Sequence, residues 1–541
     1  MAQTIYGSIV GSVTDSTGAL VGGATIQVTQ IETGATRTVS SNSVGVYSIS
    51  TLDAGTYRVI VTKAGFGEFA AKNVAVRINT IVRVDAALSV SSVSQSVQVS
   101  AQTAQLQTDS ADVHGEITSN ALQNLPQPTR TYEGLIGLMP GVSPPSASSG
   151  GTNNPARSMA LESNGTSQSA TNVRIEGVGS TNPWVQYFST AVPSVEALET
   201  VNVVTASADA DEGLGSGAAI NVQIKSGTNH LHGSFYEYHE DNALKARPYF
   251  EPVDQRLPKL IDNDFGGTLG GPIFKDKLFF FGSYEGDFTR MGSSNIVTVP
   301  TDDIRNGIMT ASPTPIYDPS TGNPDGTGRT PFADNTLPSI DPIAAKIVAL
   351  IPEPNLPGLA NNYFVNTPIV SDLHKVDTKF DWHTTQNLTF TGRVSDYPYI
   401  DNQKTIFGDV LAGGHEYTQN GNIYAISISG TYVARPNLVL SGTFGVTHST
   451  QNYAPPGTNV RYGSDVLGIP GTNLGDLPAG GSMPNFNING YEFYGYDYPA
   501  LIYNDPIFQY TGTGTWTKGR HTINFGIDIS QQHMNHMEVQ P

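Results

Sequence analysis

The sequence predicts a mainly β protein, and three observations lead to this fold class. Glycine accounts for 57 of the 541 residues and only 14% of the residues are charged, a composition typical of short strands joined by many turns. Apolar and polar residues alternate over most of the chain, as they do in strands with one buried face. In the C-terminal half, tight turns alternate with long loops, which predicts a large antiparallel sheet.

Charge and cysteine content exclude several classes of function. The formal net charge is −19, and the chain has no cysteine. A chain this acidic repels phosphate backbones, so nucleic acid is not an expected partner. Without a thiol there is no disulfide, no thiolate nucleophile and no cysteine-ligated metal. No apolar run reaches the length of a membrane-spanning helix, and Met1 is followed by strand-like sequence instead of a signal peptide.

Residues 1–90 are expected to form a small β-sandwich, because about seven short alternating segments are separated there by Gly, Asp and Asn turns. Three stretches resemble the carboxypeptidase regulatory-like domain, a transthyretin-like sandwich: GSIVGSVTDSTGALVGGATIQV (7–28), GVYSISTLDAGTYRVIVTKAGF (45–66) and VRVDAAL (82–88). The resemblance implies no peptidase chemistry. A folded spacer and a glycan-binding module are the two roles that remain open for this domain.

Residues 91–227 have a mixed pattern and are expected to form an α+β region. A Ser-, Val- and Gln-rich stretch comes first, followed by a predicted helix, SNALQNLPQ (119–127). A loop rich in Pro, Ser and Gly (140–155) precedes three strand-like segments, TNVRIEGV, LETVNVVTA and AAINVQIKSG. A loop of about twenty residues without regular structure usually marks a functional or mobile element.

Residues 228–541 predict the first part of an antiparallel β-barrel of the outer-membrane type. FKDK, TTQN, ARPN and TKGR are tight turns, and they alternate with long polar loops, the longest at about 290–373 and 451–504. Short turns at one end and long loops at the other are typical of outer-membrane barrels. A soluble sandwich would show the same alternation along its strands, but it would not explain this segregation of loop lengths.

The two faces of the predicted strands agree with a lipid exterior and a wet lumen. Residues 438, 440, 442, 444 and 446 are apolar or Gly, and the residues between them are mostly small or polar. Ile523, Phe525, Ile527 and Ile529 likewise alternate with Asn524, Gly526, Asp528 and Ser530. Phe279–Phe281 place rings on both faces directly after a tight turn, where the aromatic girdle of a barrel lies.

The order of sandwich, mixed region and barrel resembles the TonB-dependent outer-membrane receptors, in particular the Oar-like group. The segment from Val192 to Arg247 is similar to the end of the plug domain and the first barrel strand of that family. FGGTLGGPIFKDKLFFFGSYEG (265–286) is close to a hallmark of the family, and TNVRIEGV (171–178) matches a plug strand. The resemblance covers nearly the whole chain and implies that residues 91–227 hold a plug.

The number of strands departs from the family pattern. Barrels of this class close with 22 strands, whereas about nine are predicted here. An open sheet would expose an unpaired edge to lipid, which is prohibitive. We therefore expect a partial barrel, about nine of 22 strands, and a chain that is part of a longer protein.

A TonB-contact segment is expected just ahead of the plug. In this family the energy-coupling protein TonB pairs with a short extended segment, and such strand addition uses main-chain hydrogen bonds. The β-branched alternation of one seven-residue stretch fits this role: Gln95, Ser96, Val97, Gln98, Val99, Ser100 and Ala101. The alternatives are a linker or a last strand of the sandwich.

Ligand contact is expected from the plug apex and the long loops. Tyrosine is dense between residues 487 and 505, and four candidates are Tyr491, Tyr494, Tyr496 and Tyr498. Aromatic rings beside amides and carboxylates suit sugars or peptides. The alternative is that these tyrosines pack on one another within the loop.

No catalytic, metal or cofactor site is expected. Residues 213–218 match G-x-G-x-x-A, but a strand follows them in place of the helix that a dinucleotide site requires. His230 and His232 share a strand face, yet no third ligand is evident. No G-x-S-x-G elbow is present.

The sequence therefore predicts a non-enzymatic TonB-dependent receptor in the outer membrane, with its N-terminal domain in the periplasm. Its expected partners are TonB, outer-membrane lipid and an unknown small ligand such as a glycan, a peptide or a metal chelate. The alternative function is a barrel-anchored surface adhesion or scaffold protein without transport.

Overall fold

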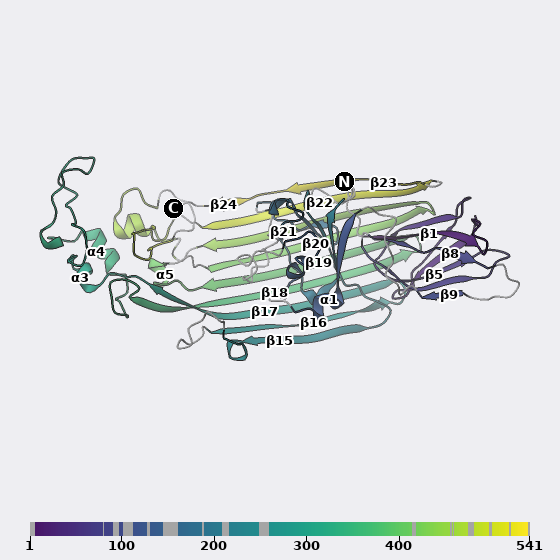
Figure 1. Ribbon diagram of the computed structural model, residues 1–541, viewed down its shortest axis with the longest axis horizontal. Coiled ribbons are helices and arrows are strands. Elements are labelled where there is room, and N and C mark those ends of the chain that lie inside the picture. Colours follow the sequence, from purple (N-terminus) through teal and green to yellow (C-terminus); the bar gives the residue numbers. More distant parts are fainter. Residues whose placement is uncertain are drawn as a thin grey trace.

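The computed structural model describes residues 6–78, 80–89, 97–100, 112–126, 130–143, 161–184, 186, 189–207, 216–247, 259–413, 418–454, 457, 459–473, 481–496, 500–518 and 521–538. The chain folds into a sandwich, a plug and a large sheet. Figure 1 shows the sandwich, in purple, at one end of the long strands of the sheet and helices α3, α4 and α5 at the other. We call these the short-turn end and the long-loop end.

The N-terminal sandwich is built from two sheets. One has the order β4-β1-β7, with β8 also paired to β1, and the other has the order β3-β2-β5-β6-β9. Their inner faces share a core that includes Ile9, Val28, Tyr47, Val59 and Leu88. The strands are β1 (Gly7–Asp15), β2 (Thr25–Gln30), β3 (Thr36–Ser40), β4 (Val46–Leu52), β5 (Gly55–Thr62), β6 (Phe69–Val76), β7 (Ile81–Arg83), β8 (Ala86–Leu88) and β9 (Val97–Ser100).

The plug is a five-stranded mixed sheet with short helices, which agrees with the expected α+β region. Its strand order is β10-β13-β14-β11-β12, and β11 runs parallel to β14. The strands are β10 (Val113–Thr118), β11 (Asn172–Ile175), β12 (Val178–Gly179), β13 (Leu198–Ala206) and β14 (Ala219–Ile224). The helices are α1 (Ser119–Asn124), α2 (Glu133–Ile136), η1 (Gln168–Ala170) and η2 (Val195–Ala197).

The C-terminal part forms one sheet in which every strand pairs with the next along the chain. Its order is β15 to β23 without a crossover, and β24 pairs with β22. The strands are β15 (His232–Asp241), β16 (Leu260–Phe274), β17 (Leu278–Val297), β18 (Tyr363–Thr385), β19 (Leu388–Gln403), β20 (Thr418–Arg435), β21 (Leu438–Ala454), β22 (Leu501–Lys518), β23 (His521–Gln532) and β24 (His536–Glu538). This succession of hairpins confirms the predicted antiparallel architecture.

The predicted strand faces are also confirmed. Leu440 and Phe444 are exposed on the outer face, whereas Val439 on the opposite face is buried. Ile523, Phe525, Ile527 and Ile529 of β23 are all more than 40% exposed, but β23 is exposed on both faces except at Asp528 and does not by itself distinguish them. Among the described residues β15 and β23 each pair on one side only, so the barrel is partial.

Most of the strands are longer than the roughly ten residues that span a membrane: β18 has 23 residues, whereas β15 has 10. One expectation about the loops needs correction. The loop predicted from about residue 290 begins only after Val297, because the polar residues Ser293–Asn295 continue to pair with β18. In the described part of the chain, no helix has both the length and the hydropathy for crossing a membrane.

The long loops pack into a small body of their own at the long-loop end. It contains α3 (Asp302–Arg305), η4 (Ala333–Asn335), α4 (Pro342–Val348), α5 (Gly408–Leu411) and η5 (Tyr462–Leu467), and η3 (Asn242–Leu244) follows β15. Val299, Ile351, Leu411, Leu467, Met483 and Tyr494 form its buried core. Three separate loops therefore share one apolar cluster.

Candidate functional site

The inner face of the barrel sheet and the plug share one hydrophobic core. Phe281, Tyr397 and Ile423 of the barrel strands lie in the same buried cluster as the plug residues. Phe279 and Phe281 point inward and are at most 1% exposed. The three phenylalanines therefore lie on both sides of the strand: Phe279 and Phe281 pack on the inner side, and Phe280 faces outward.

The β11–β12 hairpin fits into a gap on the barrel wall. Glu176 and Gly177 both have positive φ, of 51° and 78°, as a two-residue type I′ turn requires. The turn presents Val178 to Gly445 on β21, and a Cβ atom at Gly445 would lie 2.2 Å from Cγ2 of Val178. The Thr447 hydroxyl donates to the Gly179 carbonyl oxygen at 3.0 Å. The absence of a side chain at residue 445 therefore makes room for the plug.

Two buried ion pairs connect the same hairpin to the barrel. Lys379 Nζ on β18 lies 2.9 Å from Glu176 Oε1, and both side chains are 4% exposed. Arg174 Nη2 lies 2.5 Å from Asp528 Oδ2 on β23, with side chains 5% and 8% exposed. A buried charge that loses its partner is strongly destabilising, so these pairs fix the position of the plug in the barrel.

A third contact involves η2 of the plug. The Ser194 hydroxyl donates to Glu285 Oε2 at 2.6 Å. Lys375 Nζ on β18 donates to the other oxygen of the same carboxylate at 2.9 Å, and the Tyr236 hydroxyl also donates to Oε2 at 2.9 Å. Glu285 therefore accepts hydrogen bonds from one plug residue and two barrel residues.

Arg130 of the plug lies against the wall beside this group. Its guanidinium carbon is 3.6 Å from the centroid of the Tyr238 ring, close enough for a cation–π contact. Its nitrogens also lie 3.5 Å from Glu196 and 3.7 Å from Asp264. A cationic plug residue thus meets an aromatic and acidic patch of the barrel.

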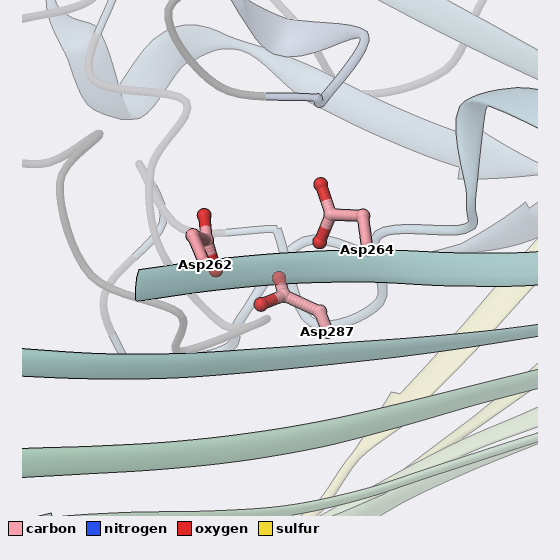
Figure 2. Close-up of side chains that lie close together, drawn as sticks. All are labelled: Asp262, Asp264 and Asp287. Carbon is pink, nitrogen blue, oxygen red and sulfur yellow. The ribbon is translucent and has the colours of Figure 1, made fainter. Parts of the chain in front are cut away.

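Three aspartates form an acidic group next to Arg130. Figure 2 shows Asp262 and Asp264 on one strand and Asp287 on the neighbouring strand, with their carboxylates gathered on the same side of the sheet. One ligand oxygen from each lies within 4.8 Å of the others. Carboxylate oxygens suit a hard cation such as Ca²⁺. The Thr289 hydroxyl donates to Asp262 at 2.7 Å, so part of this acceptor capacity is used within the protein.

The plug also buries an acid away from the wall contacts. Glu133 in α2 is 5% exposed. Burial raises the pKa of its carboxyl to about 8, and hydrogen bonding by Thr131 and the charge of Lys375 oppose this rise. The carboxyl is consequently protonated over most of the physiological range.

Three of the seven residues of the predicted TonB-contact segment lie outside the described residues. Gln95, Ser96 and Ala101 belong to that part of the chain. The backbone of Val97–Ser100 forms β9, which pairs in parallel with β6 of the sandwich. The segment is therefore extended, and it occupies the edge of a sheet. TonB contact remains a prediction.

The four loop tyrosines have different environments. Tyr494 is 1% exposed and belongs to the loop core, and Tyr496 is 6% exposed and donates to the Asp409 carbonyl oxygen at 3.1 Å. Tyr491 is half-buried, and Tyr498 lies outside the described residues. Burial raises the pKa of the Tyr494 phenol. In this arrangement Tyr494 and Tyr496 pack within the loops, so ligand contact stays a prediction for all four.

The remaining motifs form no site in the described part of the chain. Residues 213–215 of the glycine-rich motif lie outside it, and β14 follows directly. His232 Nδ1 lies 3.0 Å from the carbonyl oxygen of His230, so the two residues interact locally. Sequence reasoning missed the inward charges Glu285, Lys375 and Lys379, although charged residues at every second position of a strand can be recognised in the sequence. Glu176 lies in the turn between β11 and β12 and gives no such signal.

Family comparison decides the broad assignment. The outer membrane beta barrel domain family matches residues 223–541, which is more than half of the chain. The chain belongs to this family. Membership places it in the outer membrane, with the sheet of β15–β23 as the barrel part. The carboxypeptidase regulatory-like domain family matches residues 8–89, which confirms the resemblance drawn for the sandwich.

Relatives of this outer-membrane barrel protein are transporters and receptors. The TonB-dependent transporter Oar from Myxococcus xanthus is 26% identical over 270 residues, 47% of this chain and 24% of Oar. The alignment thus spans about a quarter of that relative's length. These similarities are to transport proteins and not to enzymes.

Solved structures of the same kind align with most of the chain. The outer membrane transporter YddB from Escherichia coli is 11% identical, with a TM-score of 0.47, and the alignment covers 77% of this chain and 47% of YddB. A mutant of the ferric enterobactin receptor PfeA from Pseudomonas aeruginosa is 14% identical with a TM-score of 0.40, over 77% of this chain and 48% of the receptor.

Proposed function

We propose that the chain belongs to a TonB-dependent receptor that takes up a scarce nutrient through a plugged barrel. One observation carries this proposal: a separate plug domain is held against the inner wall of an outer-membrane barrel by buried ion pairs, Lys379–Glu176 and Arg174–Asp528. Such contacts keep the lumen closed, yet they consist of a few discrete links. A force that pulls on the plug from the periplasm can break these ion pairs one after another, and the lumen would then open.

The nature of the ligand follows from the wall that faces it. The patch around Asp264 combines the carboxylates of Asp262 and Asp287 with the Tyr238 ring. Aromatic rings with neighbouring hydrogen-bonding groups suit glycans and peptides. The three grouped aspartates make a bare anion an unfavourable ligand at this position, because like charges repel.

The energy for opening would come from TonB, through residues 95–101. The backbone of Val97–Ser100 is already extended, and an extended edge segment can accept a further strand by main-chain hydrogen bonding. Proline lacks the N–H group that such pairing needs. Substitutions by proline in this segment should therefore abolish TonB binding without touching the barrel.

The test is binding of the purified periplasmic domain of TonB to the full chain in detergent. We expect binding to the parent chain, loss of at least about tenfold in affinity for Val97→Pro combined with Val99→Pro, and no change for the matched control Gln105→Pro. Absence of any binding by the parent chain would contradict the proposal and favour the alternative, a barrel-anchored scaffold without transport.

A further inference from the structure

Asn229 connects the sandwich to the short-turn end of the barrel. Asn229 lies between the plug and β15. Its backbone N–H donates to the Glu32 carbonyl oxygen at 2.9 Å, and its side-chain Nδ2 lies 2.9 Å from the Thr33 carbonyl oxygen and 2.7 Å from Asp276 Oδ1. The β2–β3 turn of the sandwich and the β16–β17 turn of the barrel are therefore held together through this asparagine.

Further contacts join the sandwich to the plug and to barrel strand β20. Arg77 of the sandwich lies 2.9 Å from Glu116 on β10 of the plug. The Thr431 hydroxyl on β20 donates to the Tyr6 hydroxyl at 2.6 Å. The sandwich thus contacts both the plug and the barrel at the short-turn end.

The space under the sandwich is a polar cavity of about 110 Å³. Its lining comes from all three parts of the protein and includes Asp53 of the sandwich, Glu176 and Gln223 of the plug, and Lys379 and Asp381 of the barrel. Gln223 Oε1 is buried and makes no hydrogen bond within the described residues. A buried amide oxygen without a hydrogen-bond partner costs free energy that a water molecule would relieve. We call the surface on which the sandwich rests its seat; movement of the sandwich away from this seat would let water reach Gln223.

The contacts named above between the sandwich and the other two parts are polar. They are side-chain and main-chain hydrogen bonds and a partly exposed ion pair, whereas the sandwich's apolar core lies within its own two sheets. Interfaces of this polar kind between domains of one chain allow relative motion. Burial raises the pKa of the Asp53 carboxyl, against the charges of His383, Arg37 and Lys379.

The predicted TonB segment is part of the sandwich. Val97–Ser100 pairs with Phe69–Lys72 of β6 and forms the edge of the five-stranded sheet. A pull on this segment therefore reaches the sandwich before it reaches the plug strands that begin at Val113. The role of TonB in pulling on this segment rests on the proposed function, whereas the contacts that hold the sandwich on the plug and barrel do not.

We propose that the N-terminal sandwich is a movable cover of the plug, and that it must leave its seat before the lumen opens at the short-turn end. The cover adds a first step ahead of any rearrangement of the plug: release of the Asn229, Arg77 and Tyr6 contacts exposes the polar cavity and Gln223. The plug's own ion pairs with the barrel break afterwards.

The absence of cysteine from the chain allows a direct test. A Cβ atom at Gly34 would lie 2.9 Å from Asp276 Oδ1 and 3.8 Å from its Cγ, so Gly34→Cys with Asp276→Cys places two thiols within reach of a disulfide. A third substitution, Gln223→Cys, reports access to the cavity through labelling by a polar maleimide, quantified on the peptide that contains residue 223. The full chain is used in detergent.

We expect labelling at residue 223 to be slower by about tenfold or more when the disulfide is oxidised than after reduction. The matched control is Thr29→Cys with Thr36→Cys, a cross-strand pair inside the sandwich whose hydroxyls lie 3.1 Å apart, and oxidation of this pair should leave the labelling rate unchanged. Equal rates in the oxidised and reduced Gly34/Asp276 protein would overturn the proposal.

A second variant needs no disulfide. Asn229→Ala removes the side-chain ties in a chain whose only cysteine is at residue 223, and it should raise the labelling rate by about tenfold. An unchanged rate would also overturn the cover. Neither result depends on TonB, so failure of the cover and failure of the receptor assignment are distinguishable.

Discussion

Loss of the buried lysine at residue 379 should release the plug hairpin from the barrel. Lys379→Met keeps an unbranched side chain, one atom shorter, and removes the charge, which leaves Glu176 buried at 4% exposure without its cationic partner. Breaking one side of a buried pair costs about 3–5 kcal/mol. At about 1.4 kcal/mol per factor of ten, the equilibrium for opening the hairpin should rise by roughly 10² to several times 10³.

Native-state hydrogen exchange of the β14 amides measures this opening. The Ile224 amide donates to Glu176 Oε1 at 2.7 Å and Lys379 Nζ donates to the Ile224 carbonyl oxygen at 3.2 Å, so protection at this residue should fall by the same factor. In the double variant with Glu176→Gln most of the loss should be recovered, because no uncompensated charge remains.

An exposed ion pair provides the control. Lys404 and Asp409 lie 3.9 Å apart, and their side chains are 55% and 62% exposed. Lys404→Met should change stability by less than about 1 kcal/mol. The reasoning fails if Lys379→Met leaves exchange at Ile224 unchanged, or if the double variant is no better protected than the single one.

Three further predictions concern the wall, the plug and the loops. Gly445→Ala should loosen the plug by about 1–3 kcal/mol because its new Cβ overlaps Val178, and Val178→Ala should restore plug protection from protease. Folded Glu133 keeps its proton up to about pH 8, whereas the unfolded chain loses it near the ordinary carboxyl pKa of 4.5. Because the folded state binds more protons between these two pH values, the stability of the plug should fall as pH rises through this window, by at most about 1.4 kcal/mol per pH unit. Glu133→Gln should remove this pH dependence, as measured by pH-jump hydrogen exchange. Tyr494→Ala should destabilise the loop body by about 3–5 kcal/mol, as seen in faster loop cleavage, while Tyr491→Ala should not; equal cleavage of the two variants would show that Tyr494 is no core residue.

Local pattern was sufficient to predict the hairpins of the barrel. The tight turn at FKDK could be predicted because its short polar stretch separates two strand-like segments. The alternation from Ile523 to Ile529 could be predicted because strand periodicity fixes which face each side chain occupies. The same rule predicted β13 and β14 of the plug, whereas the segment TNVRIEGV contains a turn at Glu176–Gly177 between β11 and β12. Strand ends were less predictable, since polar residues such as Ser293–Asn295 pair in the sheet through backbone groups that carry no side-chain signal.

The contacts between parts of the chain could not be predicted. Glu176 and Lys379 are 203 residues apart, and neither has a neighbour in sequence that indicates the other. Tyr494 looked like a ligand platform because tyrosine has the same composition signal in a binding loop and in a packed one. Asn229 helps to hold the sandwich in place because it contacts two turns, β2–β3 and β16–β17, that are distant from it in sequence. Its role is therefore visible only in the folded protein.

The central claim is that energy from TonB moves the cover and the plug of a barrel in the outer membrane. The most direct measurement is the labelling rate of a cysteine at residue 223 in living cells, with the inner membrane energised and after addition of a proton uncoupler. The account predicts faster labelling in energised cells, and loss of this difference when Val97→Pro and Val99→Pro are added. Labelling that is equally fast with and without the uncoupler would contradict it.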